Sequence, residues 1–279
     1  MNHDESVKRA TLFHTLHKGD LLLLPNIWDP LGAALVERLG YSAIATASAS
    51  VSFTNGYEDG ERLPFTSLLA VVKSIVTQTS LPVTVDMESG YSSDIHRLKD
   101  NIKHLVDAGV SGINIEDYNH EKNAMRSTTD QCERLQAIVE VAKSEGIPLF
   151  INARTDVYLR PGKLTEDEKL AEAIERGLAY ERAGAHGLFV PAMMNEAHLQ
   201  SIVTQIGLPV NVLMLPGAPG LDKLKAMGVR RVSFGPGLLR IAMNAIQSFL
   251  EQLPRDKNVE AITQNPLTTG ALAGLLRKK

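Results

Sequence analysis

Cysteine is almost absent from this chain of 279 residues. The single cysteine, Cys132, excludes an intramolecular disulfide and fits a reducing compartment. The eight histidines are scattered, so the sequence has no zinc-binding pattern either. A nucleophilic role for Cys132 is not expected, because it lies at the start of a predicted helix, away from the acidic residues discussed below.

An excess of basic residues is also missing. The 29 Lys and Arg are outnumbered by 32 Asp and Glu, which gives a formal charge of -3. This balance argues against a general nucleic-acid or membrane-surface binder. No apolar run reaches membrane-spanning length, and the polar N-terminus MNHDESVKRA lacks the apolar stretch of a secretory signal. We therefore expect a cytoplasmic protein without nucleic-acid or membrane partners.

Apolar, strand-like segments alternate with helical segments along the whole chain. Most of these strands are apolar almost throughout, as parallel strands covered on both faces are. Eight strand–helix units favour an α/β fold of the (β/α)8 TIM-barrel type over an open doubly wound sheet. The strands are expected at 21–25, 42–48, 81–88, 112–117, 149–155, 187–191, 209–213 and 231–234.

The segments between the strands give no sign of a second domain. We expect a single barrel domain over 1–279, with a C-terminal helical segment at about 238–279. The segments 51–62 and 119–128 are polar and are predicted to be loops. There is no P-loop, and no GxGxxG follows the first strand. The turn LPGAPG (215–220) could bind an anion, but a plain Gly/Pro turn is the preferred interpretation.

Two carboxylates end the third strand, in the stretch LPVTVDMESG (81–90). Side chains alternate along a strand, so Asp86 and Glu88 are expected to face the same side. Charged groups at the end of a buried strand need a partner, and a divalent cation is an effective one. The alternative is a solvated strand end with two incidental acids.

Barrel enzymes place their active sites at the carboxyl ends of the strands. Glu116 ends the fourth strand, so Asp86, Glu88 and Glu116 would form an oxygen-rich site suited to Mg2+ or Mn2+. Arg154, after the fifth strand, would bind a substrate carboxylate through a bidentate pair, or else form a salt bridge with one of these acids. Asp117 and Asp156 are expected to cap helices or pair locally.

The chain resembles the isocitrate lyase/phosphoenolpyruvate mutase superfamily over nearly its whole length. The resemblance implies a barrel that depends on Mg2+ and acts on α-oxo acids or their 2-hydroxy precursors. The matching segments are LPNIWDPLGAALVERLGYSAIATAS, the loop with Asp59, LPVTVDMESGY, GVSGINIEDY, INARTDVYL, GLFVPAM and LPVNVLMLPGAPGLDKLKAMGVRRVSFGPGLLR.

The resemblance also implies roles for single residues. Asp86, Glu88 and Glu116 would form the metal shell, partly through waters, and Arg154 would bind the substrate carboxylate. Asp59 would be the acid of the loop after the second strand. The family often swaps its eighth helix with a neighbour, which implies a homo-oligomer (a dimer or tetramer) in which 238–279 makes contacts. The substrate-binding residues would be Trp28, Thr46, Ala47, Ser48, Arg154 and Asn211.

Three departures from the family bear on the substrate. Residues 120–126 read HEKNAMR, without the cysteine that isocitrate lyases carry in this loop, so isocitrate cleavage is not expected. Lys122 and Asn123 echo only part of the Lys-Thr-Asn of the mutases, and Pro191 with Ala192 replaces their histidine. Glu88 stands where the family usually has Asp.

The sequence therefore predicts a Mg2+-dependent lyase. It would cleave a C–C bond of a small 2-hydroxy or α-oxo carboxylic acid through a metal-stabilised enolate and release a pyruvate-like product. Lys122 would act as a gate or acid–base group, and Asp59 would orient a water or the leaving group. One alternative is a C–P mutase or hydrolase acting on a phosphonopyruvate-like substrate. The other is an inactive barrel that serves as a binding protein.

Overall fold

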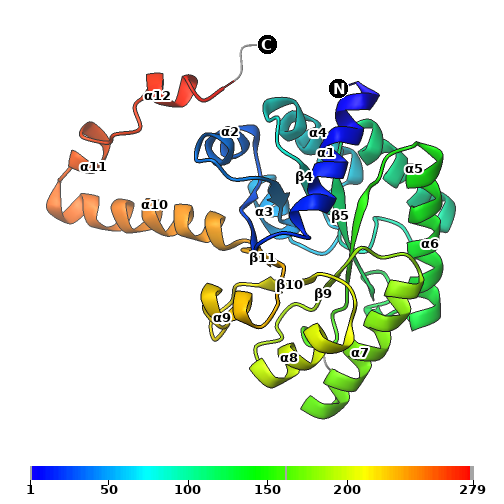
Figure 1. The fold of residues 1–279 in the computed structure, drawn as a ribbon. Helices are drawn as coiled ribbons and strands as arrows, with labels where there is room; N and C mark the ends of the chain where they lie inside the picture. The colour runs from blue at the N-terminus through cyan, green and yellow to red at the C-terminus, as the bar shows by residue number, and fades with distance from the viewer. Residues whose placement is uncertain (1, 161, 277–279) are drawn as a thin grey trace.

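The computed structural model describes residues 2–160 and 162–276 as a closed parallel barrel surrounded by helices (Figure 1). The first barrel strand consists of two segments, β1 (Leu22–Leu24) and β2 (Asn26–Ile27), separated by Pro25. β1 pairs with β11 (Arg231–Ser233) and β2 pairs with β3 (Ile44–Thr46), all in parallel. The first strand thus joins both edges of the sheet, and the predicted (β/α)8 barrel is confirmed.

The remaining elements follow the predicted order, with ends shifted by a few residues. The other barrel strands are β4 (Val83–Asp86), β5 (Gly112–Glu116), β8 (Phe150–Arg154), β9 (Gly187–Phe189) and β10 (Val210–Leu213). The surrounding helices are α2 (Pro30–Arg38), α4 (Phe65–Gln78), α5 (Ile95–Asp107), α6 (Thr128–Ser144), α7 (Glu166–Arg182), α8 (Glu196–Gln205) and α9 (Leu221–Ala226).

The N-terminal helix α1 (His3–Leu16) helps to close the amino end of the barrel. Phe13 packs edge-on against Phe150 at 5.4 Å between ring centroids, and His17 stacks on Phe150 at 3.9 Å. A Cβ at Gly112 would lie 2.8 Å from a Phe13 ring carbon, so a residue without a side chain is required there. These aromatic side chains occupy the amino end, which leaves the carboxyl end of the strands as the place for a site.

Two segments differ from the prediction. The expected loop 51–62 begins as a helix, α3 (Ser48–Thr54), because burial of Val51 and several serines outweighs their weak helix propensity. The expected loop 119–128 contains a hairpin of β6 (Tyr118–Asn119) and β7 (Ala124–Met125). Asn123 adopts a φ of 50° in its turn, a conformation that asparagine tolerates well.

The C-terminal helix α10 (Gly237–Asp256) projects away from the barrel, followed by α11 (Glu260–Thr263) and α12 (Thr269–Ala273) (Figure 1). Its apolar residues Ile241, Met243, Ile246 and Leu250 are exposed. The use of 238–279 in oligomer contacts stays a prediction, and residues 277–279 lie outside the described part. No helix in that described part has the length and apolar character to cross a membrane.

Candidate active site

Two adjacent cavities lie at the carboxyl end of the barrel strands. The inner cavity, of about 170 Å³, is lined by Asn26, Ala47, Ser48, Ala49, Asp59, Asp86, Asn114, Arg154, Leu159, Phe189, Pro191, Leu213, Ser233, Gly235 and Pro236. The outer cavity, of about 250 Å³, is lined by Ser48, Glu58, Asp59, Gly60, Arg62, Glu88, Glu116, Tyr118, His120, Asn123, Arg154, Leu159 and Arg160. Ser48, Asp59, Arg154 and Leu159 line both, so the predicted acids and the arginine come together at one place.

Asp86, the last residue of β4, has one carboxylate oxygen that is held and one that is free. Its backbone N–H donates to Thr46 Oγ1 at 3.0 Å. Its Oδ2 accepts from Ser48 Oγ at 3.1 Å and from the Ser48 N–H at 3.4 Å. Its Oδ1 is buried without a hydrogen-bond partner among the described residues. Thr46 and Ser48 therefore position Asp86, which leaves Oδ1 available to a ligand.

Glu88 lies beyond the strand, not within it. β4 ends at Asp86, and Glu88 has a φ of 51° in the turn that follows. The expectation that strand alternation places both acids on one face is therefore wrong. Glu88 still reaches the outer cavity, because its Oε2 accepts from the Glu61 N–H at 2.7 Å and its Oε1 from the Tyr91 hydroxyl at 3.1 Å.

Packing from two helices fixes this turn. Arg134 on α6 donates to the carbonyls of Ser89 at 2.6 Å and Ser92 at 2.8 Å. Gly90 has a φ of 105°, and a Cβ there would come within 2.5 Å of Leu98 on α5. The surrounding structure thus imposes the left-handed conformation of Glu88, which is unfavourable for a residue with a side chain.

Glu116 and Arg154 form an ion pair in the outer cavity. Arg154 Nη1 lies 2.9 Å from Glu116 Oε2, and its Nε and Nη2 donate to both oxygens of Asp156 at 2.6 and 3.0 Å. His120, on the hairpin, lies 2.7 Å from Glu116 Oε1 and 3.7 Å from Glu88 Oε2. The salt bridge that the sequence left open for Arg154 is therefore formed.

Negative charge is in excess at this site. Burial, together with the charges of Asp59, Glu116 and Asp86, raises the pKa of Glu88 to about 9. Burial also raises the pKa of Glu116 to about 7, although Arg154 opposes the shift. Lost hydration and the charge of Asp86 raise the pKa of Asp59. Asp59, Glu88 and Glu116 therefore hold protons more tightly than ordinary carboxyl groups do, which is the electrostatic condition that favours a bound cation.

A ready-made metal cage is not present. Among the described residues, no three His, Cys, Asp or Glu side chains are already arranged to hold a metal ion. Glu88 and Glu116 are engaged with protein donors, so they are not free ligands in this arrangement. Asp86 Oδ1 is the free carboxylate oxygen. The donor chemistry fits a divalent cation with Asp86 as a direct ligand and the two glutamates in the surrounding shell.

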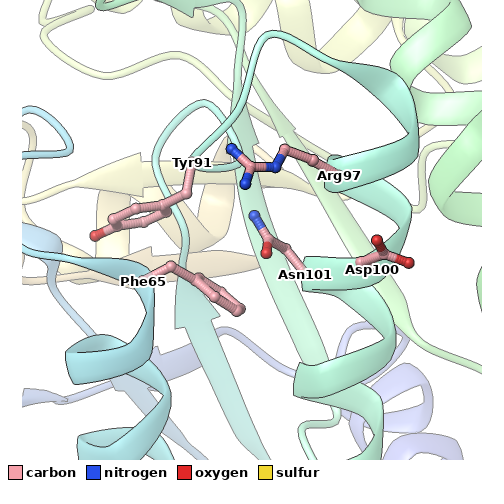
Figure 2. A pocket seen from close by; sticks show the side chains of 5 residues that line it. All are labelled: Phe65, Tyr91, Arg97, Asp100 and Asn101. Atoms are coloured by element: carbon pink, nitrogen blue, oxygen red, sulfur yellow. The ribbon is translucent and has the colours of Figure 1, made fainter.

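A third cavity, of about 260 Å³, lies between α4 and α5, with Phe65, Tyr91, Arg97, Asp100 and Asn101 around it (Figure 2). Tyr91 connects it to the active site, since its ring lines this cavity while its hydroxyl donates to Glu88. Asn101 donates to the Gly90 carbonyl at 3.0 Å. This cavity therefore adjoins the outer side of the turn that holds Glu88.

Four predicted site residues do not line the inner or outer cavity. Thr46 is buried on β3, where its Oγ1 accepts from the Asp86 N–H. Trp28 is partly buried and packs against the main hydrophobic core. Asn211 is buried on β10 and donates to Ser233 Oγ at 3.2 Å. Lys122 is exposed in the hairpin turn, where its N–H donates to Asn119 Oδ1. The basic side chain that the hairpin brings into the outer cavity is His120, not Lys122.

Sequence reasoning missed Asn114, His120 and Arg160 as cavity residues. Asn114 stands two residues before Glu116 on β5, so strand alternation could have placed it on the same inward face. Arg160 lies over the Tyr118 ring, with Cζ 3.9 Å from the centroid. No local pattern marks His120 or Arg160, because both come from loops that close over the barrel. Asp156 pairs locally with Arg154, as predicted, whereas Asp117 pairs with Arg176, which is distant in the chain.

Comparisons with known proteins match this architecture. The phosphoenolpyruvate phosphomutase family model matches residues 13–254. An uncharacterized protein of Mycobacterium tuberculosis is 36% identical over 250 residues, 87% of this chain and 91% of that protein. The 2,3-dimethylmalate lyase of Eubacterium barkeri is 24% identical over 271 residues, 93% of this chain and 90% of that one. The solved structure of a candidate lyase or mutase from Burkholderia cenocepacia J2315 has a TM-score of 0.88 and 29% identity, covering 97% of this chain and 96% of that one.

Proposed function

The chain belongs to the phosphoenolpyruvate phosphomutase family, and we propose that it is a divalent-metal-dependent lyase that cleaves a C–C bond of a small 2-hydroxy or α-oxo carboxylic acid. Family membership makes it an enzyme of the isocitrate lyase/phosphoenolpyruvate mutase type. Oxaloacetate-like acids and 2-hydroxy diacids are the proposed substrates, with a pyruvate-like product. One observation carries the proposal: several carboxylates gather around Arg154, and Arg154 still has N–H groups that make no hydrogen bond to the protein.

Arg154 retains the capacity to bind a substrate carboxylate. A guanidinium has five N–H donors. Three contacts are made to protein oxygens, through Nε and Nη2 to Asp156 and through Nη1 to Glu116. Each Nη carries two hydrogens, so one donor on Nη1 and one on Nη2 remain. Arg154 lines both cavities, and these two donors suit the two oxygens of a carboxylate.

The acids supply the place for a metal. Asp86 would hold a divalent cation through its free Oδ1, and Glu88 and Glu116 would act around it, through waters or by releasing their present partners. Oxygen donors favour Mg2+, with Mn2+ as the close alternative. When bound, such a cation polarises a substrate oxygen and stabilises negative charge that develops on it.

Two protein groups are placed to move protons. Cleavage of a 2-hydroxy acid needs a base for the hydroxyl proton and an acid for the carbon that keeps the electron pair. Asp59 lines both cavities, and its raised pKa makes it a better base than an ordinary aspartate. Burial lowers the pKa of His120, but its hydrogen bond to Glu116 raises it above the usual value overall. His120 therefore holds a proton more tightly than an ordinary histidine, and we assign to it the acid–base role predicted for Lys122.

The apolar residues of the inner cavity favour C–C over C–P chemistry. Phe189, Pro191 and Leu213 line the cavity at or just after the ends of β9 and β10. A phosphonyl group carries up to two negative charges and needs several donors. An apolar wall instead suits a carbon fragment.

The test is a substrate comparison with and without Mg2+. Oxaloacetate and 2-hydroxy diacids should give a pyruvate-like product or another C–C cleavage product with Mg2+ and none with EDTA. Product from phosphonopyruvate alone would refute the C–C proposal and support the C–P alternative. An absence of product from all substrates, together with no calorimetric binding of Mg2+ or oxalate, would support an inactive binding barrel.

The C-terminal helices α10 to α12 expose several large apolar side chains. We propose that their exposed apolar face packs on a second copy of this chain, because Ile241, Ile246 and Leu250 cover little of their own barrel. Light scattering should show a dimer or tetramer. An Ile246→Lys variant should shift the mass toward the monomer, whereas a wild-type monomer would contradict the proposal.

A further inference from the structure

An arginine lies buried beneath the floor of the inner cavity. Arg231, on β11, is 1% exposed. Its Nη2 donates to Asn114 Oδ1 at 3.0 Å, while Nε and Nη1 have no hydrogen-bond partner within the described residues. In that same part of the chain, no carboxylate oxygen lies within 4.0 Å of it. Burial lowers the pKa of Arg231 to about 9, and the negative charge of Asp86 partly opposes this effect.

Such a residue is costly for the fold. A buried charge without a direct counter-charge loses hydration that its surroundings return only in part. An uncharged side chain of similar size would fill the same space at lower cost. Stability therefore does not account for an arginine at this position.

The contact that Arg231 makes determines how Asn114 is oriented. Asn114 Oδ1 accepts from Arg231 Nη2 and also from Asn152 Nδ2 at 2.9 Å. A guanidinium can only donate, so the oxygen of the Asn114 amide must point toward Arg231. The Nδ2 of Asn114 is left without a protein acceptor in the described part, and Asn114 lines the inner cavity.

Asn114 also stands beside the acid with the free oxygen. In the barrel, Asn114 pairs in register with Asp86 on one side and with Asn152 on the other. Its NH2 group is therefore a fixed donor next to the place where Asp86 Oδ1 would hold a cation.

We propose that Arg231 is a positioning residue, which holds the Asn114 amide from below so that its NH2 group donates to an oxygen of the oxo acid in the inner cavity. This inference rests on the proposed function, since it requires an anionic ligand beside Asp86. It also explains the buried charge. With a neutral residue only the Asn152 amide would hold Asn114, and the two amides could turn together so that the Asn114 oxygen faces the ligand.

Oxalate is the probe, because it can only accept hydrogen bonds and resembles a pyruvate enolate. Oxalate is titrated calorimetrically into Mg2+-saturated wild type, Arg231→Met, Asn114→Ala and the double variant. Each single variant should weaken oxalate binding about tenfold or more, the effect of one hydrogen bond to a charged group. The double variant should be no weaker than Asn114→Ala, because Arg231 acts through that amide.

Thermal unfolding separates positioning from packing. Arg231→Met should keep or raise Tm while oxalate affinity falls, whereas a purely structural arginine would lower Tm and leave affinity unchanged. Phe13→Leu is the matched control, since the Phe13 ring lies 5.9 Å from the Arg231 guanidinium and does not line the inner cavity. It should lower Tm and leave oxalate affinity unchanged.

Equal oxalate binding by wild type and Arg231→Met would overturn the positioning role alone. If Arg231→Met does not fold, the test rests on Asn114→Ala. An Asn114→Ala variant that binds oxalate as tightly as the wild type would overturn the inference. Arg231→Lys keeps a charged donor and should recover most of the affinity. Failure of the wild type to bind oxalate with Mg2+ would refute both the inference and the proposed function.

Discussion

Glu116 and Asp117 are neighbours in the chain, yet they occupy opposite environments. Both are buried, at 2% and 0% exposure. Asp117 lies between the barrel and α7, where Oδ2 accepts from Tyr180 at 2.7 Å and Arg176 at 3.1 Å. Its Oδ1 accepts from the Asp156 N–H at 2.9 Å. Every oxygen of Asp117 is bonded, and one arginine balances its charge.

Glu116 points the other way, into the outer cavity. It contacts Arg154 and His120, but Glu88 and Asp86 add uncompensated negative charge nearby. Burial is therefore common to both acids and does not separate them. The local balance of charge does: a buried acid with matched donors holds the fold together, whereas buried acids in excess of their cations are ready to bind something else.

The largest expected effect is on stability at Asp117. Asp117→Asn removes the negative charge beside buried Arg176, so the free energy of unfolding should fall by about 3 kcal/mol. Urea unfolding measures this change. Glu172→Gln removes the other, partly exposed partner of Arg176 and should cost less than about 1 kcal/mol. Equal losses in the two variants would show that Asp117 is not the structural anchor.

The next effect is on ligand binding at Glu116. Glu116→Gln removes one of the excess charges, so Mg2+ affinity should fall by about 10- to 100-fold while stability is kept or raised. Calorimetry and urea unfolding provide the two readouts. Glu121→Gln, on the hairpin that follows Glu116 but exposed and bonded to Ser93, is the control and should not change Mg2+ affinity. A destabilised Glu116→Gln variant with normal Mg2+ affinity would show that Glu116, like Asp117, stabilises the fold and does not bind the metal.

A further effect concerns pH. The pKa of Glu116 is about 7 in the fold against 4.5 for an ordinary glutamate, so between these values the folded state holds a proton that the unfolded state has lost. Stability contributed by this group is present below pH 4.5 and is lost as pH rises to 7, by up to about 1.4 kcal/mol per pH unit.

Urea unfolding of the metal-free protein at pH 5, 6 and 7 tests this sign. The free energy of unfolding of the wild type, minus that of Glu116→Gln, should fall as pH rises. Taking this difference removes the contribution of other groups such as His17, which both proteins share. A difference that is flat or rises with pH would contradict the raised pKa of Glu116.

The smallest effect is expected for Glu88→Asp. The shorter side chain keeps the charge but moves its oxygens away from the Glu61 N–H and the Tyr91 hydroxyl. Mg2+ affinity and turnover should each fall by about tenfold at most, near the low end for residues around a metal. Unchanged values would mean that the length of Glu88 does not set the geometry of the site.

Particular residues show what could be predicted from sequence. The acids at the ends of β4 and β5, and Arg154 at the end of β8, follow from the rule that barrel strands deliver functional groups at their carboxyl ends. The same local rule indicates Lys122, which is exposed, whereas His120 two residues earlier lines the outer cavity. A hairpin decided between them, and its turn depends on contacts of Tyr118 and Asn123 that the sequence pattern does not show.

The sequence by itself determined the barrel and the kinds of group at its open end, because apolar strand periodicity and residue type are local properties. Only the tertiary structure decided that Glu88 stands in a left-handed turn, that Arg154 is already paired, and that Arg231 lies beneath Asn114. These outcomes depend on which side chains from distant strands meet in the low-dielectric interior. There the stability of a charge depends on which other groups the fold brings beside it, and many of these are far away in the chain.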